Sequence, residues 1–198
     1  MLRPIVDWNA FVQTTLLTEL TIETFRPFYE DSFRPLVGEA VFANQHGNWR
    51  ADYRDQIAEL HAPERHTYVA VAEAEDGIAG YVAWSVDPAR RNDSVTILAV
   101  SAKHRRHHVG TALCEHAFEK MRTLGAEVVE IGTRGDPFHA PARALYERLG
   151  CIPLPVTVYY DSSEPKPLRD GCHHTRPGLG EYPSHSTSDT RLVPWGRT

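Results

Sequence analysis

The chain has 198 residues, of which 41% are hydrophobic and 24% are charged, a composition typical of one globular domain with room for an appendage. Its net charge of −5 excludes a protein that attracts nucleic acid or an anionic membrane over its whole surface. No apolar run approaches the ~20 residues that span a bilayer. We therefore expect neither nucleic acid nor a membrane among its partners.

The cysteine and histidine content bears on compartment and metal binding. Three cysteines, an odd number without paired spacing, argue against a disulfide framework and favour a reducing cytoplasm. The N-terminal stretch contains Asp7 and Glu19 and lacks the apolar core of a signal peptide. Histidines gather at 104–108 and in Cys172-His-His174, but neither stretch has a second ligand pair at zinc spacing, so we predict no metal site.

The first third of the chain is predicted to be mostly helical. Residues 2–6 fit a short edge strand. Apolar residues then recur at helical spacing over 16–33, and Pro27 and Pro35 should kink or divide this stretch into two helices. A further helix is expected over 48–60.

The pattern then changes to the period of a β-sheet. Strands are predicted over 68–73 and 78–86, joined by the tight turn Glu75-Asp-Gly77. Gly80 inside the second strand indicates a bulge or a close approach. A charged loop leads to a third strand over 94–100, rich in Val, Thr and Ile.

Helices and strands alternate in the second half. A helix is expected over 109–124, followed by a strand over 127–132, a short helix over 141–149 and a last strand over 156–160. The inward face of the first helix is predicted to consist of Val109, Leu113, Ala117, Met121 and Leu124.

This order of elements predicts an α/β fold with a mixed sheet, in which strand–helix–strand units supply a parallel component. Residues 1–161 would form the domain. From 162 to 198 Pro, Gly, Ser and His dominate, which is typical of a disordered or loosely packed tail.

The most informative segment is the run that follows the strand 94–100. It reads His104-Arg-Arg-His-His-Val-Gly-Thr-Ala-Leu113, a basic loop that opens a helix. Backbone N–H groups at a helix start form an anion site, and Arg105 and Arg106 add positive charge beside it. The loop is therefore suited to a pyrophosphate.

A second segment makes the pattern more specific. It reads His139-Ala-Pro-Ala-Arg-Ala-Leu-Tyr-Glu-Arg-Leu-Gly150. The two segments, in this order, resemble the pyrophosphate loop and the Asn-x-x-Ala-x-x-Leu-Tyr-Glu-x-x-Gly segment of the GNAT superfamily of acyl-CoA N-acyltransferases, over roughly Leu16 to Tyr160. The resemblance implies a mainly antiparallel central sheet with a parallel, splayed pair of strands, flanked by helices.

The resemblance also implies a set of residues that bind acetyl-CoA. The backbone of Leu98 and Val100 would bond the pantetheine arm and the acyl carbonyl. His139 stands where the family has an asparagine that contacts the CoA arm, and it can still donate one hydrogen bond. The pyrophosphate would lie on the loop residues Arg105, Arg106, His107, His108, Val109, Gly110 and Thr111.

One loop residue departs from the family pattern. His108 stands at the family's first loop glycine, where φ would be positive; histidine is tolerated there better than a β-branched or bulky residue. Either the loop has ordinary geometry at this position, or CoA binds less closely.

Two catalytic residues are expected. Tyr146 stands where the family places its general acid, and a phenol can protonate a departing thiolate. The attacking amine must lose a proton, and the strand 94–100 carries no carboxylate for this task. Glu130 on the next strand is the nearest substitute, with Asp136 and His139 also within reach.

An aromatic and acidic cluster in the N-terminal helices would bind the acceptor amine, through charge and cation–π attraction. It consists of Phe28, Tyr29, Glu30, Asp31 and Phe33, with Trp84 added from the second strand of the hairpin. Aromatic core residues beside solvated carboxylates are an equally good interpretation of the same pattern.

The resulting hypothesis is an acetyltransferase that moves the acetyl group of acetyl-CoA to a primary amine of a small molecule or protein, by direct attack in a ternary complex. The alternative is a non-catalytic sensor of the same fold that binds acyl-CoA. A Rossmann-type nucleotide site is disfavoured because the Gly-x-Gly-x-x-Gly fingerprint is missing. Relatives often form homodimers through the last strands, so a homodimer is expected here too.

Overall fold

The N-terminal part of the domain is a helical layer. A computed structural model describes residues 6–7 and 14–154. The helical layer consists of α1 (Thr14–Arg26), the π-helix η1 (Pro27–Phe33), α2 (Arg34–Val37), α3 (Glu39–His46) and α4 (Trp49–Ala58). The sequence pattern did not predict α3.

Both prolines lie where one helix gives way to the next, as predicted. Pro27 is the first residue of η1 and Pro35 lies in the first turn of α2. Because proline has no N–H to donate to the preceding turn, the α-helical ladder cannot continue unchanged through Pro27. The chain keeps a helical path here but widens into a π-helix, a form often found at functional sites.

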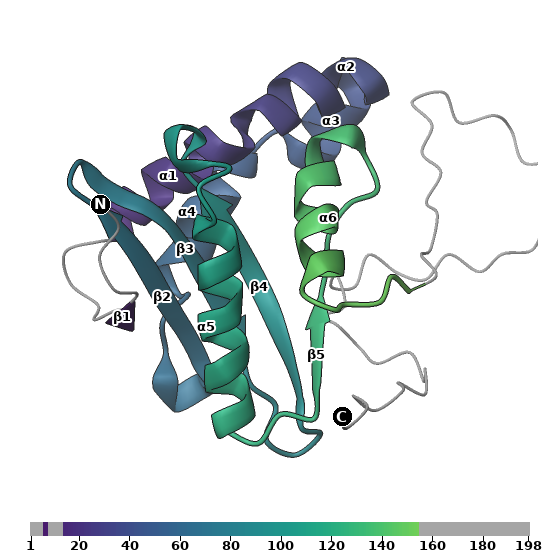
Figure 1. Cartoon of the computed structure of the whole chain (residues 1–198). Helices are drawn as coiled ribbons and strands as arrows, with labels where there is room; N and C mark the ends of the chain where they lie inside the picture. Colours follow the sequence, from purple (N-terminus) through teal and green to yellow (C-terminus); the bar gives the residue numbers. More distant parts are fainter. Residues whose placement is uncertain (1–5, 8–13, 155–198) are drawn as a thin grey trace, which may run out of the picture.

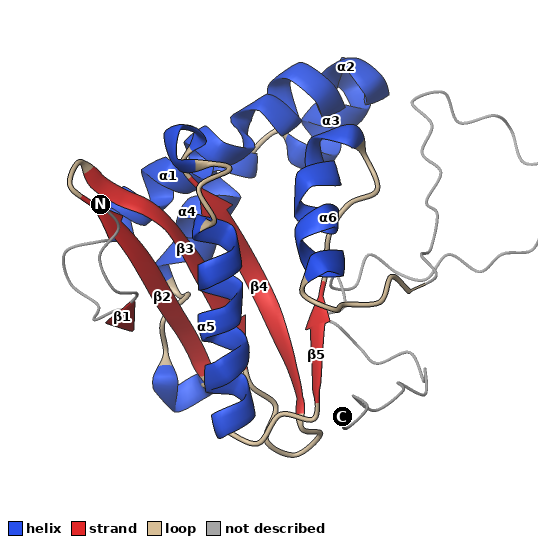
Figure 2. Ribbon diagram, in the orientation of Figure 1, coloured by secondary structure: helices blue, strands red, loops and turns tan. Residues whose placement is uncertain are grey.

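The sheet has five strands in the order β1-β2-β3-β4-β5. All neighbours are antiparallel except β4 and β5, which run parallel because α5 crosses over between them (Figure 2). The strands are β1 (Val6–Asp7), β2 (Thr67–Ala74), β3 (Gly77–Ser85), β4 (Asn92–Val100) and β5 (Val128–Ile131), and the helices beyond β4 are η3 (Ala102–His104), α5 (Val109–Thr123), η4 (Pro137–His139) and α6 (Ala140–Arg148). The predicted fold class, a mixed and mainly antiparallel sheet with a parallel pair, is confirmed.

The parallel pair is short, and this creates an open edge on β4. Pairing with β5 runs from Asn92–Val128 to Val95–Ile131 and ends there, whereas β4 continues to Val100. Figure 1 shows the two strands diverging from this point. We call the segment 96–100 the open edge of β4.

A β-bulge shifts the side chains of that open edge. Trp84 of β3 pairs with Val95, but the preceding residue, Ala83, pairs with Ile97, so Thr96 is the extra residue. The extra residue inverts the alternation along β4. Val95 and Leu98 therefore pack on one face of the sheet and Ile97 on the other.

The sheet is covered on both faces. One hydrophobic cluster lies under α5 and α6 and includes Val109, Leu113, Cys114, Ala117, Phe118, Met121 and Leu145. The other lies under α1 and α4 and includes Leu17, Leu20, Ile57, Leu60, Val69, Val71 and Tyr81. The predicted inward face of α5 is correct except at Leu124, which follows the last turn and is 49% exposed.

Gly80 and Trp84 of β3 are both buried in close packing. Gly80 is a close approach, as predicted, because a Cβ there would lie 2.8 Å from the carbonyl oxygen of Ala99. Trp84, which was predicted to line an acceptor pocket, packs in the core instead. Its side chain is 2% exposed and stacks on Tyr68 within the cluster under α5.

The predicted strand over 156–160 and the predicted tail over 162–198 lie outside the described residues, as does most of the predicted strand over 2–6. None of the helices in the described part of the chain is both long and apolar enough to cross a bilayer.

Candidate functional site

The start of α5 presents a row of backbone N–H groups. The first hydrogen bond at this end joins the Ala112 N–H to the His108 carbonyl (3.0 Å), so the N–H groups of Val109, Gly110 and Thr111 precede the intrahelical ladder. Among the described residues, no side chain caps this end. The arrangement gives a positive helix terminus whose donors can meet an anion.

The loop before α5 has the backbone of a glycine loop although it lacks the glycine. Arg106 and His108 both take the left-handed conformation, with φ of 62° and 60°. The structure therefore keeps positive φ at His108, and the expectation of ordinary geometry at this position is not supported. Alternation of left-handed and other conformations turns successive N–H groups towards one concavity.

Substitutions at His108 test this geometry. We expect His108→Val to lower the free energy of unfolding by about 1–2 kcal/mol, because a β-branched side chain clashes in the left-handed region. His108→Gly should keep or raise stability, because glycine has no Cβ. Denaturant unfolding of the two variants checks the order. Equal stability of the Val and Gly variants would mean that residue 108 does not hold positive φ in solution.

Cationic side chains surround the loop. Arg105 and Arg106 are exposed, and the Nε of Arg105 donates to the carbonyl of Val100 at 3.3 Å, which holds this guanidinium beside the open edge of β4. Lys103 is directed elsewhere, because its ammonium pairs with Asp76 at 2.5 Å. His107 lines a cavity of about 460 Å³ with Asp76, on the β2–β3 side of the loop.

The backbone of the open edge faces away from β3 at two residues. The N–H of Ser101 donates to the carbonyl of Ala79 on β3 (2.9 Å). Because backbone groups point to alternate sides along a strand, those of Val100 and Leu98 point to the side that β5 has left. Gly110 of α5 lies between this edge and α6. A Cβ there would be 3.7 Å from the Val100 side chain and 3.2 Å from that of Leu145 on α6. The anion site, the open edge and α6 therefore converge.

Tyr146 lies on α6, facing the core under α5. Its ring packs against that hydrophobic cluster and its backbone carbonyl accepts the N–H of Cys151 at 3.0 Å. Burial, reinforced by the neighbouring Cys114 and Cys151 thiols, raises the pKa of Tyr146 above its ordinary value. The phenol therefore stays protonated over the physiological range, as a proton donor must.

The structure does not bring Glu130 to Tyr146. Glu130 is exposed on β5 opposite Ser94. Its neighbours Val129 and Ile131 pack into the cluster under α5, so the Glu130 side chain points to the other face of the sheet. The predicted acid and the predicted base therefore lie on opposite sides of β5.

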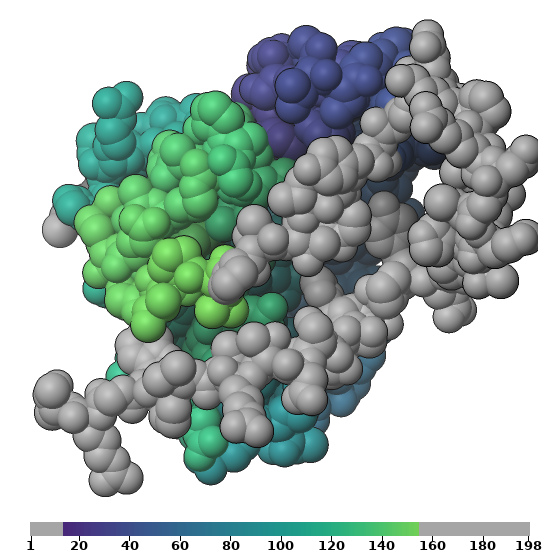
Figure 3. Space-filling model, turned by 90° about the vertical axis from the view of Figure 1, so that its right-hand side faces the viewer, coloured from purple at the N-terminus to yellow at the C-terminus, as the bar shows by residue number. Residues whose placement is uncertain are grey.

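The predicted acceptor residues Phe28 and Tyr29 belong to an aromatic cluster on η1. The Phe28 ring contacts those of Phe138 (5.7 Å between centroids) and His139 (4.9 Å), and the Arg134 guanidinium lies 5.0 Å from its centroid. Tyr29 stacks on Trp49 at 4.6 Å. Figure 3 shows the N-terminal helices adjoining α6 on this side of the molecule. The loop after β5 thus meets η1 beside the start of α6.

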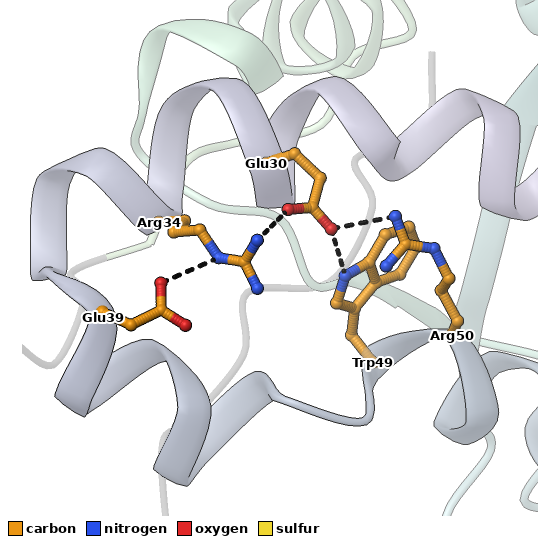
Figure 4. Close-up of polar contacts among 5 residues, drawn as sticks. All are labelled: Glu30, Arg34, Glu39, Trp49 and Arg50. Atoms are coloured by element: carbon orange, nitrogen blue, oxygen red, sulfur yellow. Dashed lines mark hydrogen bonds and ion pairs between the residues drawn. The ribbon is translucent and has the colours of Figure 1, made fainter.

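Glu30, which was predicted to bind the amine, is engaged by neighbouring side chains. Its carboxylate accepts from Arg34 (2.6 Å), Arg50 (2.9 Å) and the indole N–H of Trp49 (3.2 Å), as Figure 4 shows. Burial alone would raise the pKa of Glu30, but these hydrogen bonds and charges outweigh it and hold the pKa below its ordinary value. Glu30 therefore joins η1 to α4, while Asp31 is exposed to solvent.

The structure reveals a pair that sequence reasoning did not recognise. The carboxylate of Asp136 lies 2.7 Å from the ring Nδ1 of His139 and also accepts the His139 backbone N–H at 3.2 Å. An Asp that precedes Pro137 at a helix start is an N-cap signal, and three residues further on it reaches His139. That signal could have identified the pair.

The described residues offer no metal centre. Over 6–7 and 14–154, no three or more His, Cys, Asp or Glu side chains are placed together to hold a metal ion. Cys114 and Cys151 are both free thiols.

Comparison with known proteins identifies the family. The family model described as Acetyltransferase (GNAT) family matches residues 20–151. The chain therefore belongs to the GNAT acetyltransferase family. None of the curated proteins matches it.

Solved structures agree on the fold. Histone acetyltransferase HPA2 and related acetyltransferase from Corynebacterium glutamicum superposes with a TM-score of 0.58 at 18% identity, over 81% of this chain and 91% of that one. An aminoglycoside acetyltransferase from an uncultured soil metagenomic sample gives 0.55 at 20% identity, over 82% and 99%. The ribosomal-protein-S18-alanine N-acetyltransferase of Escherichia coli gives 0.51 at 19% identity, over 76% and 77%.

Proposed function

We propose that this protein transfers the acetyl group of acetyl-CoA to a primary amine of a small molecule or protein, by direct attack in a ternary complex. The observation that carries the proposal is the convergence of three features: the uncapped start of α5, the open edge of β4 and the hydroxyl-bearing face of α6. In acyl transfer from acetyl-CoA, the first would hold the pyrophosphate, the second the arm and the acyl carbonyl, and the third would donate a proton to the thiolate.

The residues present fit acetyl-CoA. The N–H groups of Val109, Gly110 and Thr111 and the guanidinium of Arg105 would hold its pyrophosphate. The N–H groups of Leu98 and Val100 would hold the arm and the acyl carbonyl. When bound, acetyl-CoA supplies an activated acetyl thioester whose sulfur leaves as a thiolate. Tyr146 would give its phenolic proton to that sulfur.

The proposed acceptor is an amine that approaches from η1. Phe28 and Tyr29 supply aromatic rings beside the start of α6, and the Asp31 carboxylate is exposed nearby. With Glu30 committed to Arg34 and Arg50, recognition would depend on ring stacking and on Asp31.

Binding and turnover together test the proposal. We expect isothermal titration to detect acetyl-CoA binding, and thiol release from acetyl-CoA to depend on an added amine. The panel contains primary alkylamines, an aminoglycoside and an alanine-ended peptide, because two fold neighbours carry the last two in their names. Binding without thiol release across the panel would favour the sensor alternative. Absence of binding at millimolar acetyl-CoA would contradict the proposal.

Two further expectations from the sequence, a cytoplasmic location and a homodimer formed through the last strands, stay predictions. Size-exclusion chromatography with light scattering checks the second.

A further inference from the structure

Asp136 and His139 form a rigid pair at the start of α6. Asp136 accepts both the backbone N–H and the ring Nδ1 of His139. The loop that carries the pair is itself fixed, because Arg143 of α6 donates to the carbonyls of Arg134 (2.5 Å) and Asp136 (2.8 Å). The His139 side chain is 14% exposed, so it is largely shielded from solvent but still accessible.

The carboxylate determines which ring nitrogen carries the proton. When Nδ1–H donates to Asp136, the lone pair of neutral imidazole lies on Nε2. An imidazole oriented in this way by a carboxylate is suited to accept a proton from a substrate. Burial alone would raise the pKa of Asp136, but the hydrogen bonds from the ring and the backbone N–H of His139 outweigh it and hold the pKa below its ordinary value, so the orienting group is ionised at neutral pH.

The pair lies between the proposed acceptor residues and the proposed acid. The His139 ring contacts that of Phe28 at 4.9 Å. Tyr146 is seven residues further on, about two helical turns and roughly 10 Å along the axis of α6, for which His139 is the N-cap residue. That span is enough for an amine nitrogen, the acyl carbon and the thioester sulfur in sequence.

The nearby carboxylates are less suitable as a base. Glu130 points to the other face of the sheet, and Glu30 is engaged by two guanidinium groups and an indole N–H. Asp31 is exposed to solvent. Among the groups considered for proton removal, His139 therefore has the best position.

We propose that His139, oriented by Asp136, is the general base that deprotonates the acceptor amine. The inference rests on the proposed function. One proton of the alkylammonium passes to Nε2 of His139, which frees the nitrogen lone pair, and the nitrogen then bonds to the acyl carbon. The carbon–sulfur bond breaks, and the thiolate takes the proton of Tyr146. Solvent removes the second nitrogen proton, which leaves the amide, and the proton on His139, and it returns one proton to Tyr146.

The substitution His139→Asn separates this role from a contact with CoA. Asn can donate a hydrogen bond to the CoA arm but cannot accept a proton at neutral pH. A basic alkylamine, with a pKa of ~10.4, needs a base at pH 7, whereas phenylhydrazine is already neutral. For His139→Asn we expect turnover with the alkylamine to fall about 100-fold. Acetyl-CoA affinity by calorimetry and turnover with phenylhydrazine should stay close to those of the wild type.

Asp136→Asn tests the positioning role. We expect kcat with the alkylamine to fall and KM to stay unchanged, and the ¹⁵N spectrum of His139 to lose its Nδ1-protonated signature. His66→Asn is the matched control, because His66 is exposed and left-handed (φ 58°) at the far end of β2, where asparagine is tolerated. The turnover of His66→Asn should equal that of the wild type with both amines.

Three results would overturn the inference. The first is that His139→Asn keeps wild-type turnover with the alkylamine. The second is that its turnover falls equally with the alkylamine and with phenylhydrazine. The third is that its turnover falls only because it binds acetyl-CoA more weakly. If thermal unfolding shows that the His139→Asn variant does not fold, His139→Gln is used in its place. A wild-type protein that fails to bind acetyl-CoA, or that binds it and acetylates neither amine, would instead remove the proposed function, and the inference with it.

Discussion

Tyr146→Phe should lower kcat by about 100-fold and leave acetyl-CoA affinity unchanged, because it removes the proton donor and keeps the ring. The ring packs in the cluster under α5, so its loss would disturb the fold, whereas loss of the hydroxyl alone should not. Steady-state thiol release together with calorimetric titration of acetyl-CoA separates the two quantities.

Tyr68→Phe is the matched control for this variant. Tyr68 stacks on Trp84 at 5.7 Å and packs against the same cluster from β2, away from the open edge of β4. Its turnover should equal that of the wild type. If Tyr146→Phe also turns over at the wild-type rate, the thiolate takes its proton from another source and Tyr146 is only a packing residue.

Arg105→Ala should weaken acetyl-CoA binding by about 10-fold or more, because a hydrogen bond to a charged group contributes about 1.5–3 kcal/mol. The guanidinium is held beside the open edge of β4 by the carbonyl of Val100, and it is exposed. Its effect should therefore shrink as salt rises, since exposed charges are screened. Titrations of acetyl-CoA at low and high salt measure both effects.

Arg122→Ala controls for the loss of a surface charge. Arg122 lies in the last turn of α5, at the opposite end from the proposed pyrophosphate, and pairs with Glu119 at 3.4 Å. Acetyl-CoA affinity should not change in this variant. Wild-type affinity in Arg105→Ala would count against the placement of the pyrophosphate on this loop.

The sequence predicted most of the framework because local signals agreed with the fold. Proline marked the helix changes at 27 and 35, glycine marked the close approach at 80, and the two GNAT-like segments placed α5 and α6. The bulge at Thr96 was not predictable, since an inserted residue leaves no local pattern and is seen only in the pairing with Ala83 and Trp84.

The site was harder to predict because long-range pairing decides what a side chain does. Glu30 beside aromatic rings suited an amine, but two arginines from α2 and α4 occupy it. Trp84 could have faced either side of the sheet, and regular alternation along β3 places it with Val82 in the cluster under α5. His139 takes its orientation from Asp136, and this contact within one turn depends on the path of the loop after β5.

The π-helix Pro27–Phe33 carries the proposed acceptor residues, and a change of one residue in its length would change which side chains meet the amine. A π-helix carries surplus backbone, so a single-codon deletion at the exposed Asp31 could return the segment to an α-helical path. Because a π-bulge amounts to one inserted residue, the deletion takes up the surplus within this segment and changes which of its side chains face inward. Leu17 and Leu20 lie upstream and would keep their core positions while a different set of side chains met the incoming amine. Selectivity could thus diverge between relatives without remodelling the sheet.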